Sequence, residues 1–253
     1  SIGGGTPQRI LTGIETAVTF SPQADRLAYI RDGSEPGVRE LVVASVDGTT
    51  PQALATTSGQ QLFPLEAPSW SPDGVHIACP VMDTSAGFSG FIALVSLTDG
   101  TLTRLTSSDW YYVGRIQWLA DGVRIMASAA KEPLGAMQLW EVEYPSGSSR
   151  LARADINSND GVSVSSDMRS LVSVRTSLPT SIWTVSVPGG ADAKQLPLGV
   201  TRFFGVMWTH DGRLLYASTT RGTSDLWLAD ADGRNALQLT FDDATERDPV
   251  MSR

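Results

Sequence analysis

One turn motif recurs five times along the 253 residues, each time directly after a short apolar triplet. The motif is of the Ser-Pro-Asp-Gly type, and its copies begin at Ser21, Ser71, Leu119, Ser165 and Thr209. Successive copies are therefore 50, 48, 46 and 44 residues apart. A period in this range predicts a repeat architecture, in which each repeat is one supersecondary unit that stacks on its neighbours. Repeats of this kind are more often binding scaffolds than catalysts.

A single repeat contains four short apolar segments separated by turn signals. In the last full repeat these segments cover residues 206–208, 213–218, 225–229 and 235–240. The first pair is joined by Thr209-His210-Asp211-Gly212, in which Gly212 is placed to take a positive φ. The last pair is joined through Asp232-Gly233, a strong hairpin signal. Four strands and no helix-period segment are typical of one propeller blade.

The other repeats follow the same template, so we predict an all-β fold, a β-propeller of four-stranded antiparallel blades and of the six-bladed type. Five complete blades are expected at residues 17–56, 67–107, 115–154, 161–198 and 205–241. A sandwich is not strictly excluded, but sandwiches do not repeat one turn motif five times.

The two ends of the chain match parts of a further blade. Residues 1–13 read as a hairpin turn and a fourth strand, and residues 247–253 read as a first strand. In a six-bladed ring, both ends would belong to one closing blade, which is how propellers avoid a free sheet edge. Two middle strands of about 25 residues would then be missing. We therefore expect residues 1–253 to form a single propeller domain that is a segment of a longer protein.

The recurring strings Ser-Pro-Asp-Gly, Leu-Ala-Tyr, Leu-Trp-Leu, Asp-Gly and Gln-Leu-Thr resemble the WD-like repeats of the TolB-type six-bladed propeller over essentially the whole chain. Residues 77–80, 113–122 and 181–183 further resemble the propeller at the C-terminal end of bacterial receptor-like serine/threonine protein kinases. This resemblance implies a sensor or interaction domain tethered to a signalling domain. It favours an extracytoplasmic, periplasmic location if that kinase is anchored in a membrane. The first, third and fourth turns depart from the consensus, which leaves the blades unequal.

Composition and charge exclude two partner classes. The net charge of −8 argues against nucleic acid, which needs a cationic stripe to displace counterions. The longest uncharged apolar stretch, around residues 91–97, is too short for membrane insertion. The single cysteine, Cys79, lies within an expected strand, where we interpret it as a small buried hydrophobe.

No catalytic or cofactor motif stands out from the repeats. The string closest to a nucleophile elbow, Gly87-Phe88-Ser89-Gly90, lacks the final glycine and precedes a strand rather than a helix. His76 and His210 both occupy ordinary repeat positions, and no Cys or His spacing fits a metal. Kinase signatures are also missing from these residues. We therefore expect no enzymatic activity and no cofactor within this segment.

Candidate binding residues lie in the loops that join a fourth strand to the next first strand. These loops share one face of a propeller, and exposed aromatic side chains there supply large, rigid contact area for a partner. The candidates are Phe63, Asp109, Trp110, Tyr111, Tyr112, Arg202, Phe203 and Phe204. The alternative is that these rings pack over the interfaces between blades. Trp110 is the one tryptophan outside the repeat register; the other six are expected in the core between blades.

A weaker candidate is an acidic loop near the C-terminus. It contains Asp242, Asp243, Glu246 and Asp248, which could hold a cation at the mouth of the channel. The alternative is a solvated loop without a ligand.

The sequence thus favours a non-catalytic module that binds another protein or a small ligand at its loop face. Two alternatives stay open: a propeller that gates substrate for a peptidase domain absent from this segment, and a periplasmic scaffold similar to TolB. The domains that flank the segment would discriminate between these three.

Overall fold

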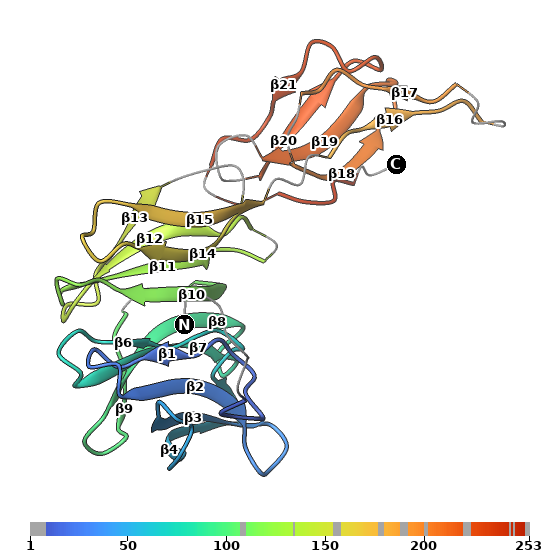
Figure 1. Ribbon diagram of the computed structural model, residues 1–253. Coiled ribbons are helices and arrows are strands. Elements are labelled where there is room, and N and C mark those ends of the chain that lie inside the picture. The colour runs from blue at the N-terminus through green and yellow to red at the C-terminus, as the bar shows by residue number, and fades with distance from the viewer. Residues whose placement is uncertain are drawn as a thin grey trace. The chain divides into compact units, whose positions relative to one another are not determined.

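The computed structural model describes residues 9–106, 110–133, 135–153, 158–176, 180–187, 192–199, 202–219, 224–242, 244 and 246–250, except for the side chains of Arg153 and Arg202. All regular elements in these ranges are β-strands (Figure 1). The chain divides into two compact units, residues 1–153 with 159–175 and residues 154–158 with 176–253.

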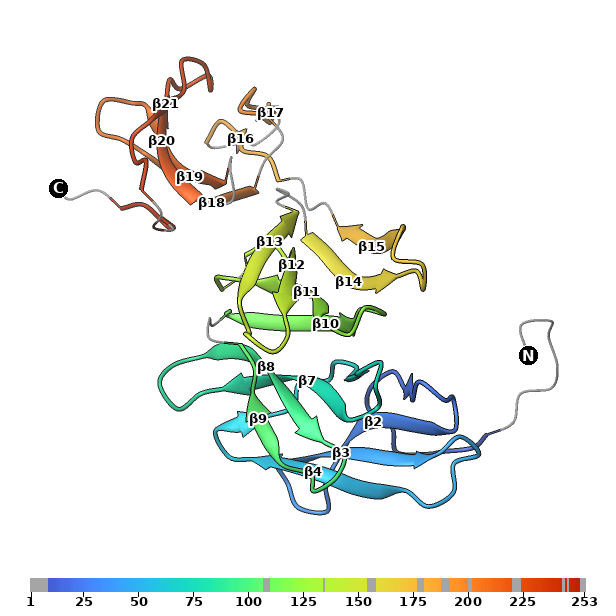
Figure 2. The same cartoon turned by 90° about the vertical axis from the view of Figure 1, so that its left-hand side faces the viewer.

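The first unit contains three large antiparallel sheets that follow one another in chain order, besides a two-stranded sheet at residues 158–176 (Figure 2). The first sheet has the order β1 (Thr19–Phe20), β2 (Arg26–Asp32), β3 (Val38–Ser45) and β4 (Gln52–Ser58). The second is built from β6 (Ser69–Trp70), β7 (His76–Asp83), β8 (Ser89–Ser96) and β9 (Leu102–Arg104), and β5 (Gln61–Leu62) also pairs with β7. The third has the order β10 (Tyr112–Trp118), β11 (Arg124–Ala130), β12 (Gln138–Glu143) and β13 (Ser149–Arg153).

The remaining strands make one more four-stranded sheet and two short ones. The four-stranded sheet of the second unit has the order β18 (Arg202–Trp208), β19 (Leu214–Thr219), β20 (Ser224–Ala229) and β21 (Leu237–Gln238). The blade expected at residues 161–198 contains two two-stranded sheets, β14 (Ser158–Val164) with β15 (Leu171–Thr176) and β16 (Trp183–Thr184) with β17 (Lys194–Gln195). The all-β class and the four-stranded antiparallel sheets are confirmed, whereas the number of complete blades stays a prediction.

The recurring turn owes its conformation to hydrogen bonds within the motif itself. In the second copy, the Ser71 hydroxyl donates to Asp73 Oδ1 over 2.5 Å and accepts from the amide of His76 over 2.9 Å. The same carboxylate accepts from the amide of Val75, and Gly74 takes a φ of 71°. Ser165 with Asp167 and Thr209 with Asp211 repeat the arrangement. In these three repeats, the motif therefore caps the start of the second strand with its own side chains.

These turns predict a specific loss of stability in acid. The hydroxyl hydrogen bonds from Ser71 and Ser165 lower the pKa values of Asp73 and Asp167 below the ordinary 3.8, and Arg213 with Thr209 lowers that of Asp211 to about 2. A carboxyl whose pKa is depressed on folding stabilises the fold above its unfolded pKa and loses that contribution as the pH falls. We therefore expect the unfolding temperature to fall between pH 3.8 and about 2.

Thermal unfolding followed by circular dichroism over this pH range would measure the effect. The triple variant Asp73→Asn, Asp167→Asn, Asp211→Asn is expected to show a flatter profile, because its amides do not titrate. A wild-type unfolding temperature that stays constant in this window would contradict the assignment.

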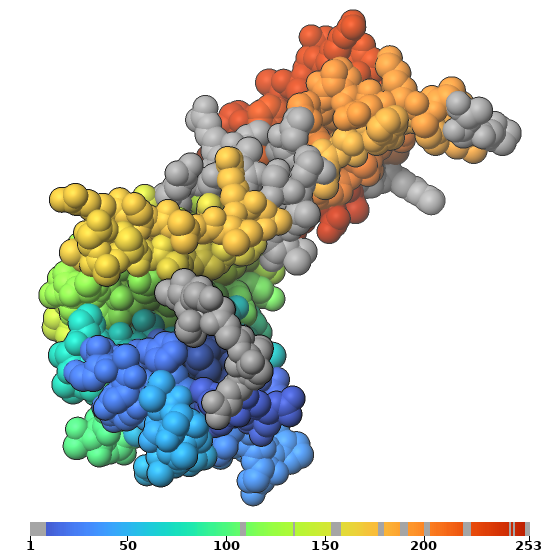
Figure 3. All heavy atoms as spheres, in the orientation of Figure 1, coloured from blue at the N-terminus to red at the C-terminus, as the bar shows by residue number. Residues whose placement is uncertain are grey.

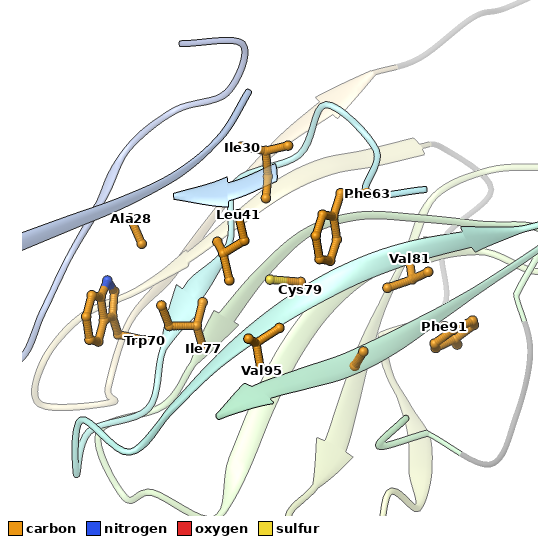
Figure 4. Close-up of a cluster of buried hydrophobic side chains, with 11 residues drawn as sticks. Ala28, Ile30, Leu41, Phe63, Trp70, Ile77, Cys79, Val81, Phe91 and Val95 are labelled. Carbon is orange, nitrogen blue, oxygen red and sulfur yellow. The ribbon is translucent and has the colours of Figure 1, made fainter. Parts of the chain in front are cut away.

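The core of the first unit lies between neighbouring sheets. Figure 4 shows side chains of the first sheet, among them Ile30 and Leu41, meeting Ile77 and Cys79 of β7. Trp70 belongs to this cluster, and Trp118 belongs to the corresponding cluster between the second and third sheets. The first-strand tryptophan thus packs against the preceding sheet in both cases. On the face seen in the space-filling view, atoms of neighbouring sheets of the first unit lie directly against one another (Figure 3).

Cys79 is fully buried, as expected, and burial raises the pKa of its thiol. The expectation that the repeat tryptophans are all buried is wrong for Trp183 and Trp208, whose exposed fractions are 55% and 52%. The strand register fixes which face of the sheet a side chain occupies, but burial also needs a second sheet against that face.

A second repeated contact joins neighbouring sheets at the hairpin between their third and fourth strands. A Cβ atom on Gly100 would overlap the carbonyl oxygen of Leu54, and one on Gly147 would overlap that of Leu105. Leu54 and Leu105 both follow the third strand of the preceding sheet, in its fourth-strand segment. A Cβ atom on Gly48 of the first sheet would likewise overlap the carbonyl oxygen of Ile10. Ile10 therefore lies against the hairpin of the first sheet as Leu54 and Leu105 lie against the hairpins of the second and third sheets, and the assignment of residues 1–13 to a closing blade stays a prediction.

Candidate binding surface

One end of the first unit gathers two kinds of loop. Because the strands form antiparallel meanders, the hairpins β2–β3, β7–β8 and β11–β12 lie at the same end as the connections that enter the next sheet. Hydrogen bonds join the two kinds of loop directly. Arg39 Nη1 donates to the carbonyl oxygen of Phe63 over 2.6 Å, and the amide of Asn159 donates to the carbonyl oxygen of Met137 over 2.8 Å. We call this end of the first unit the loop face.

Trp110 is placed in the core rather than on the surface. Its exposed fraction is 1%, and its backbone exchanges two hydrogen bonds with Gly90, of 2.9 and 2.6 Å. The indole packs edge-to-face on Trp140 at 5.7 Å, and the Lys131 ammonium lies 5.7 Å from its ring centre. The expectation of an exposed ring is therefore wrong for Trp110, because the bridge to Gly90 draws this residue into the cluster between the second and third sheets.

Phe63 shows the same departure. Its side chain has an exposed fraction of 0% and belongs to the cluster between the first and second sheets. Its amide donates to Thr57 Oγ1 over 3.0 Å, and its carbonyl accepts from Arg39. Both groups of the backbone are thereby satisfied within the fold, and the ring is not available to a partner.

Tyr111 does reach the surface. Its amide donates to the carbonyl of Ala130, which fixes the backbone, while the half-buried ring packs on Phe88 at a centroid distance of 4.7 Å with the two ring planes tilted by 37°. Phe88 itself is 44% exposed. Sequence reasoning missed Phe88 as a binding residue because it considered only the loops between repeats. The antiparallel order of the strands places both kinds of loop at one end of the sheets, and this order could have indicated Phe88 as a candidate.

Tyr112 forms a polar pair with a second residue that sequence reasoning missed. Its hydroxyl donates to Glu66 Oε1 over 2.9 Å, and both side chains are half-buried. Burial raises the pKa of the Glu66 carboxyl, although the Tyr112 hydroxyl and the charge of Arg115 act in the opposite direction and Asp160 adds to the rise. Burial and the neighbouring Glu66 also raise the pKa of Tyr112. The pair therefore combines a desolvated carboxylate with a neutral phenol.

The other candidate residues belong to the second unit. Phe203 is half-buried and packs edge-to-face on Tyr216 at 5.6 Å, and Phe204 lies 4.7 Å from the guanidinium carbon of Arg247. Arg202 begins β18, and its side chain is outside the described part of the chain. Asp109 and Asp243 also lie outside the described residues. A binding role for these residues stays a prediction.

The acidic loop is held mainly through its backbone. Glu246 donates its amide to the carbonyl of Ser224 over 2.8 Å, Asp248 donates to that of Phe204 over 3.0 Å, and Asp242 accepts from the amide of Ala244. Over the ranges that the structure covers, no three Asp, Glu, His or Cys side chains come together as a metal site. A cation in this loop, which includes Asp243, stays a prediction. No helix in the described part of the chain is long and apolar enough to cross a membrane.

Comparison with known proteins identifies the fold. No family model and no curated protein sequence matches the chain. Among solved structures, TolB from Acinetobacter baumannii matches with a TM-score of 0.50 and 17% identity over 91% of this chain and 55% of TolB. An oligogalacturonate lyase in complex with manganese matches with a TM-score of 0.50 and 14% identity over 88% of this chain and 63% of the lyase. Puromycin hydrolase matches with a TM-score of 0.50 and 18% identity over 80% of this chain and 33% of the hydrolase.

Together with the antiparallel sheets, these matches show a β-propeller fold of the TolB-like type. At such low identities the likeness concerns the fold alone. The chain spans about half the length of TolB and less than two thirds of the lyase. The closer resemblance to kinase-associated propellers stays a prediction.

Proposed function

We propose that this chain is a non-catalytic β-propeller module that binds a partner protein at its loop face and serves as a sensor or interaction domain of a larger signalling protein. The observation that carries the proposal is the aromatic pair of Phe88, which is 44% exposed, and the half-buried Tyr111. Phe88 lies in the hairpin between β7 and β8, and Tyr111 lies in the segment that leads into β10. Aromatic pairs offer large contact area at small entropic cost and are enriched at the energetic centres of interfaces.

A second candidate is a propeller that gates or orients substrate for an enzyme domain. Two of the three similar structures are named as a lyase and a hydrolase, and the chain covers 33% of the hydrolase. The likeness to TolB supports, as a third candidate, a periplasmic scaffold of that kind. Reading the domains encoded on either side of this segment would discriminate these functions, because a kinase, a hydrolase domain or a secretion signal each favours a different one.

The proposed surface is tested by removing the aromatic pair. We expect the double variant Phe88→Ala, Tyr111→Ala to reduce retention of a partner from native cell extract at least tenfold, since interface aromatics of this kind contribute on the order of 2 kcal/mol each. The measurement is quantitative retention on the immobilised full-length protein.

The matched control is Val123→Ala, which removes an exposed apolar side chain (52% exposed) from a turn at the opposite end of the third sheet. It should leave retention unchanged, and both variants should unfold at nearly the wild-type temperature. Equal retention by the double variant and the control would count against the loop face as the binding surface.

A further inference from the structure

Glu66 differs electrostatically from the other partly buried acids of the chain. Glu40 pairs with Arg31 at 2.8 Å, Asp121 pairs with Arg124 at 2.7 Å, and Glu141 pairs with Arg150 at 2.6 Å. The aspartates with a resolved change all have lowered pKa values: Asp25, Asp47, Asp73, Asp83, Asp99, Asp121, Asp167, Asp192 and Asp211. Within the described residues, Glu66 is the one carboxyl whose pKa is raised.

The surroundings of Glu66 explain this exception. Among the described residues, its carboxylate receives one side-chain hydrogen bond, from the neutral Tyr112 hydroxyl, and forms no ion pair. Arg39, whose charge lowers the pKa of Tyr112, donates to the carbonyl of Phe63 at 2.6 Å and pairs with Asp32 at 3.5 Å. Arg115 is exposed, and its positive charge lowers the pKa of Glu66. The negative charge of Asp160 raises that pKa and so opposes the effect of Arg115.

The groups beside this pair on the β10 side are uncharged. A Cβ atom at Gly114, two residues after Tyr112 in β10, would lie 2.9 Å from Met137 Cε, 3.4 Å from the carbonyl oxygen of Ser128 and 3.8 Å from Glu66 Oε1. On this side the carboxylate is thus flanked by main chain, a methionine methyl group and a phenol. A half-buried carboxylate in such a setting gains free energy when an external cation pairs with it, because the desolvation penalty has already been incurred on folding.

The geometry points to a site for a cationic side chain, and we propose that Glu66 and Tyr112 bind an arginine or lysine side chain of the partner protein. This inference rests on the proposed function of the loop face. A carboxylate accepts two parallel hydrogen bonds from a guanidinium, and a tyrosine ring beside it offers a face for the cation. The net charge of −8 favours the approach of a basic partner.

The test uses two small probes of nearly equal size and shape, the charged Nα-acetyl-arginine methylamide and the corresponding neutral citrulline derivative, in which a carbonyl oxygen replaces one NH2 group. Each is titrated into the full chain and followed by backbone amide NMR shifts. We expect the arginine probe to bind with a dissociation constant in the millimolar range and to shift the amides of residues 66, 112 and 114, and we expect the citrulline probe to bind at least tenfold more weakly.

Glu66→Gln should weaken binding of the arginine probe at least tenfold, and Tyr112→Phe should weaken this binding by a smaller factor. The matched control is Glu143→Gln, which makes the same chemical change at an exposed residue at the other end of β12. Absence of arginine binding to the wild type, equal binding of both probes, or equal effects of the two glutamine variants would overturn the proposal.

A stability measurement separates this role from a structural one. Glu66 has a raised pKa on folding, so its carboxyl stabilises the fold when protonated and loses that contribution as the pH rises above its ordinary value of 4.5. Glu66→Gln should therefore unfold at or above the wild-type temperature at pH 7, since the amide oxygen still accepts from Tyr112. A clear fall in the unfolding temperature would instead indicate a structural role.

Failure of this inference is distinguishable from failure of the proposed function. If the aromatic double variant loses the partner while Glu66→Gln retains it fully, the loop face binds but Glu66 does not contribute. If Glu66→Gln loses the arginine probe while the aromatic double variant retains the partner, the cation site stands and the proposed interface lies elsewhere.

Discussion

Gly100→Ala is expected to lower the free energy of unfolding of the first unit by about 3 kcal/mol or more. Gly100 has a φ of 73°, and a left-handed conformation costs an alanine about 1–2 kcal/mol. The added Cβ would also overlap the backbone carbonyl oxygen of Leu54, so that the hairpin would have to move away from the preceding sheet. Displacing well-packed backbone adds about 1–3 kcal/mol.

A matched glycine separates the two effects. Gly122 has the same φ of 73°, but no atom lies within 4 Å of the position of its Cβ. Gly122→Ala should therefore show the conformational penalty alone, about 1–2 kcal/mol. Urea denaturation of both variants measures the difference. Equal losses would mean that the contact between the Gly100 hairpin and Leu54 does not stabilise the fold.

Trp110→Ala is expected to destabilise the chain by about 3–5 kcal/mol, the usual loss for truncating a buried aromatic side chain. The ring is 1% exposed and is held between the second and third sheets, against Trp140 and beneath Lys131. Removing it leaves a cavity where two sheets meet. Thermal and urea unfolding of the variant measure the loss.

Trp110→Phe serves as the control. The indole Nε1 is buried without a hydrogen-bond partner, so Trp110→Phe removes side-chain volume but no hydrogen bond. Its loss of unfolding free energy should therefore be clearly smaller than that of Trp110→Ala. Partner retention by Trp110→Phe should match that of the wild type at a temperature where both are folded. A Trp110→Ala variant that keeps its unfolding temperature but fails to retain the partner would show a direct binding role for this ring.

The local features that the sequence predicted well are those with short-range causes. Ser71 and Asp73 form the turn through their own side chains, and Gly74 supplies the positive φ, so four residues suffice to predict it. The hairpin glycines follow from the same kind of signal. Burial of Cys79 follows from its place in an apolar strand that is covered on both faces.

The candidate site was predicted less well because its members come from different sheets. Trp110 lies outside the repeat register and was therefore expected in a loop, but its backbone bridge to Gly90 places the ring in the core. Glu66 precedes Tyr112 by 46 residues, and no local pattern marks the two as partners. Phe88 belongs to a hairpin within a repeat, whereas the sequence-based candidates came only from the loops that join one repeat to the next.

The sequence by itself determined the all-β class, the four-stranded unit and the chemistry of its turns, because strand periodicity and turn hydrogen bonds act over a few residues. Only the tertiary structure decided which aromatic rings are buried and which acid lacks a cationic partner. Those properties depend on how one sheet packs on the next, across separations of tens of residues. For this reason Trp110 moved from the surface to the core, and Phe88, Tyr111, Tyr112 and Glu66 emerged together as the candidate binding surface.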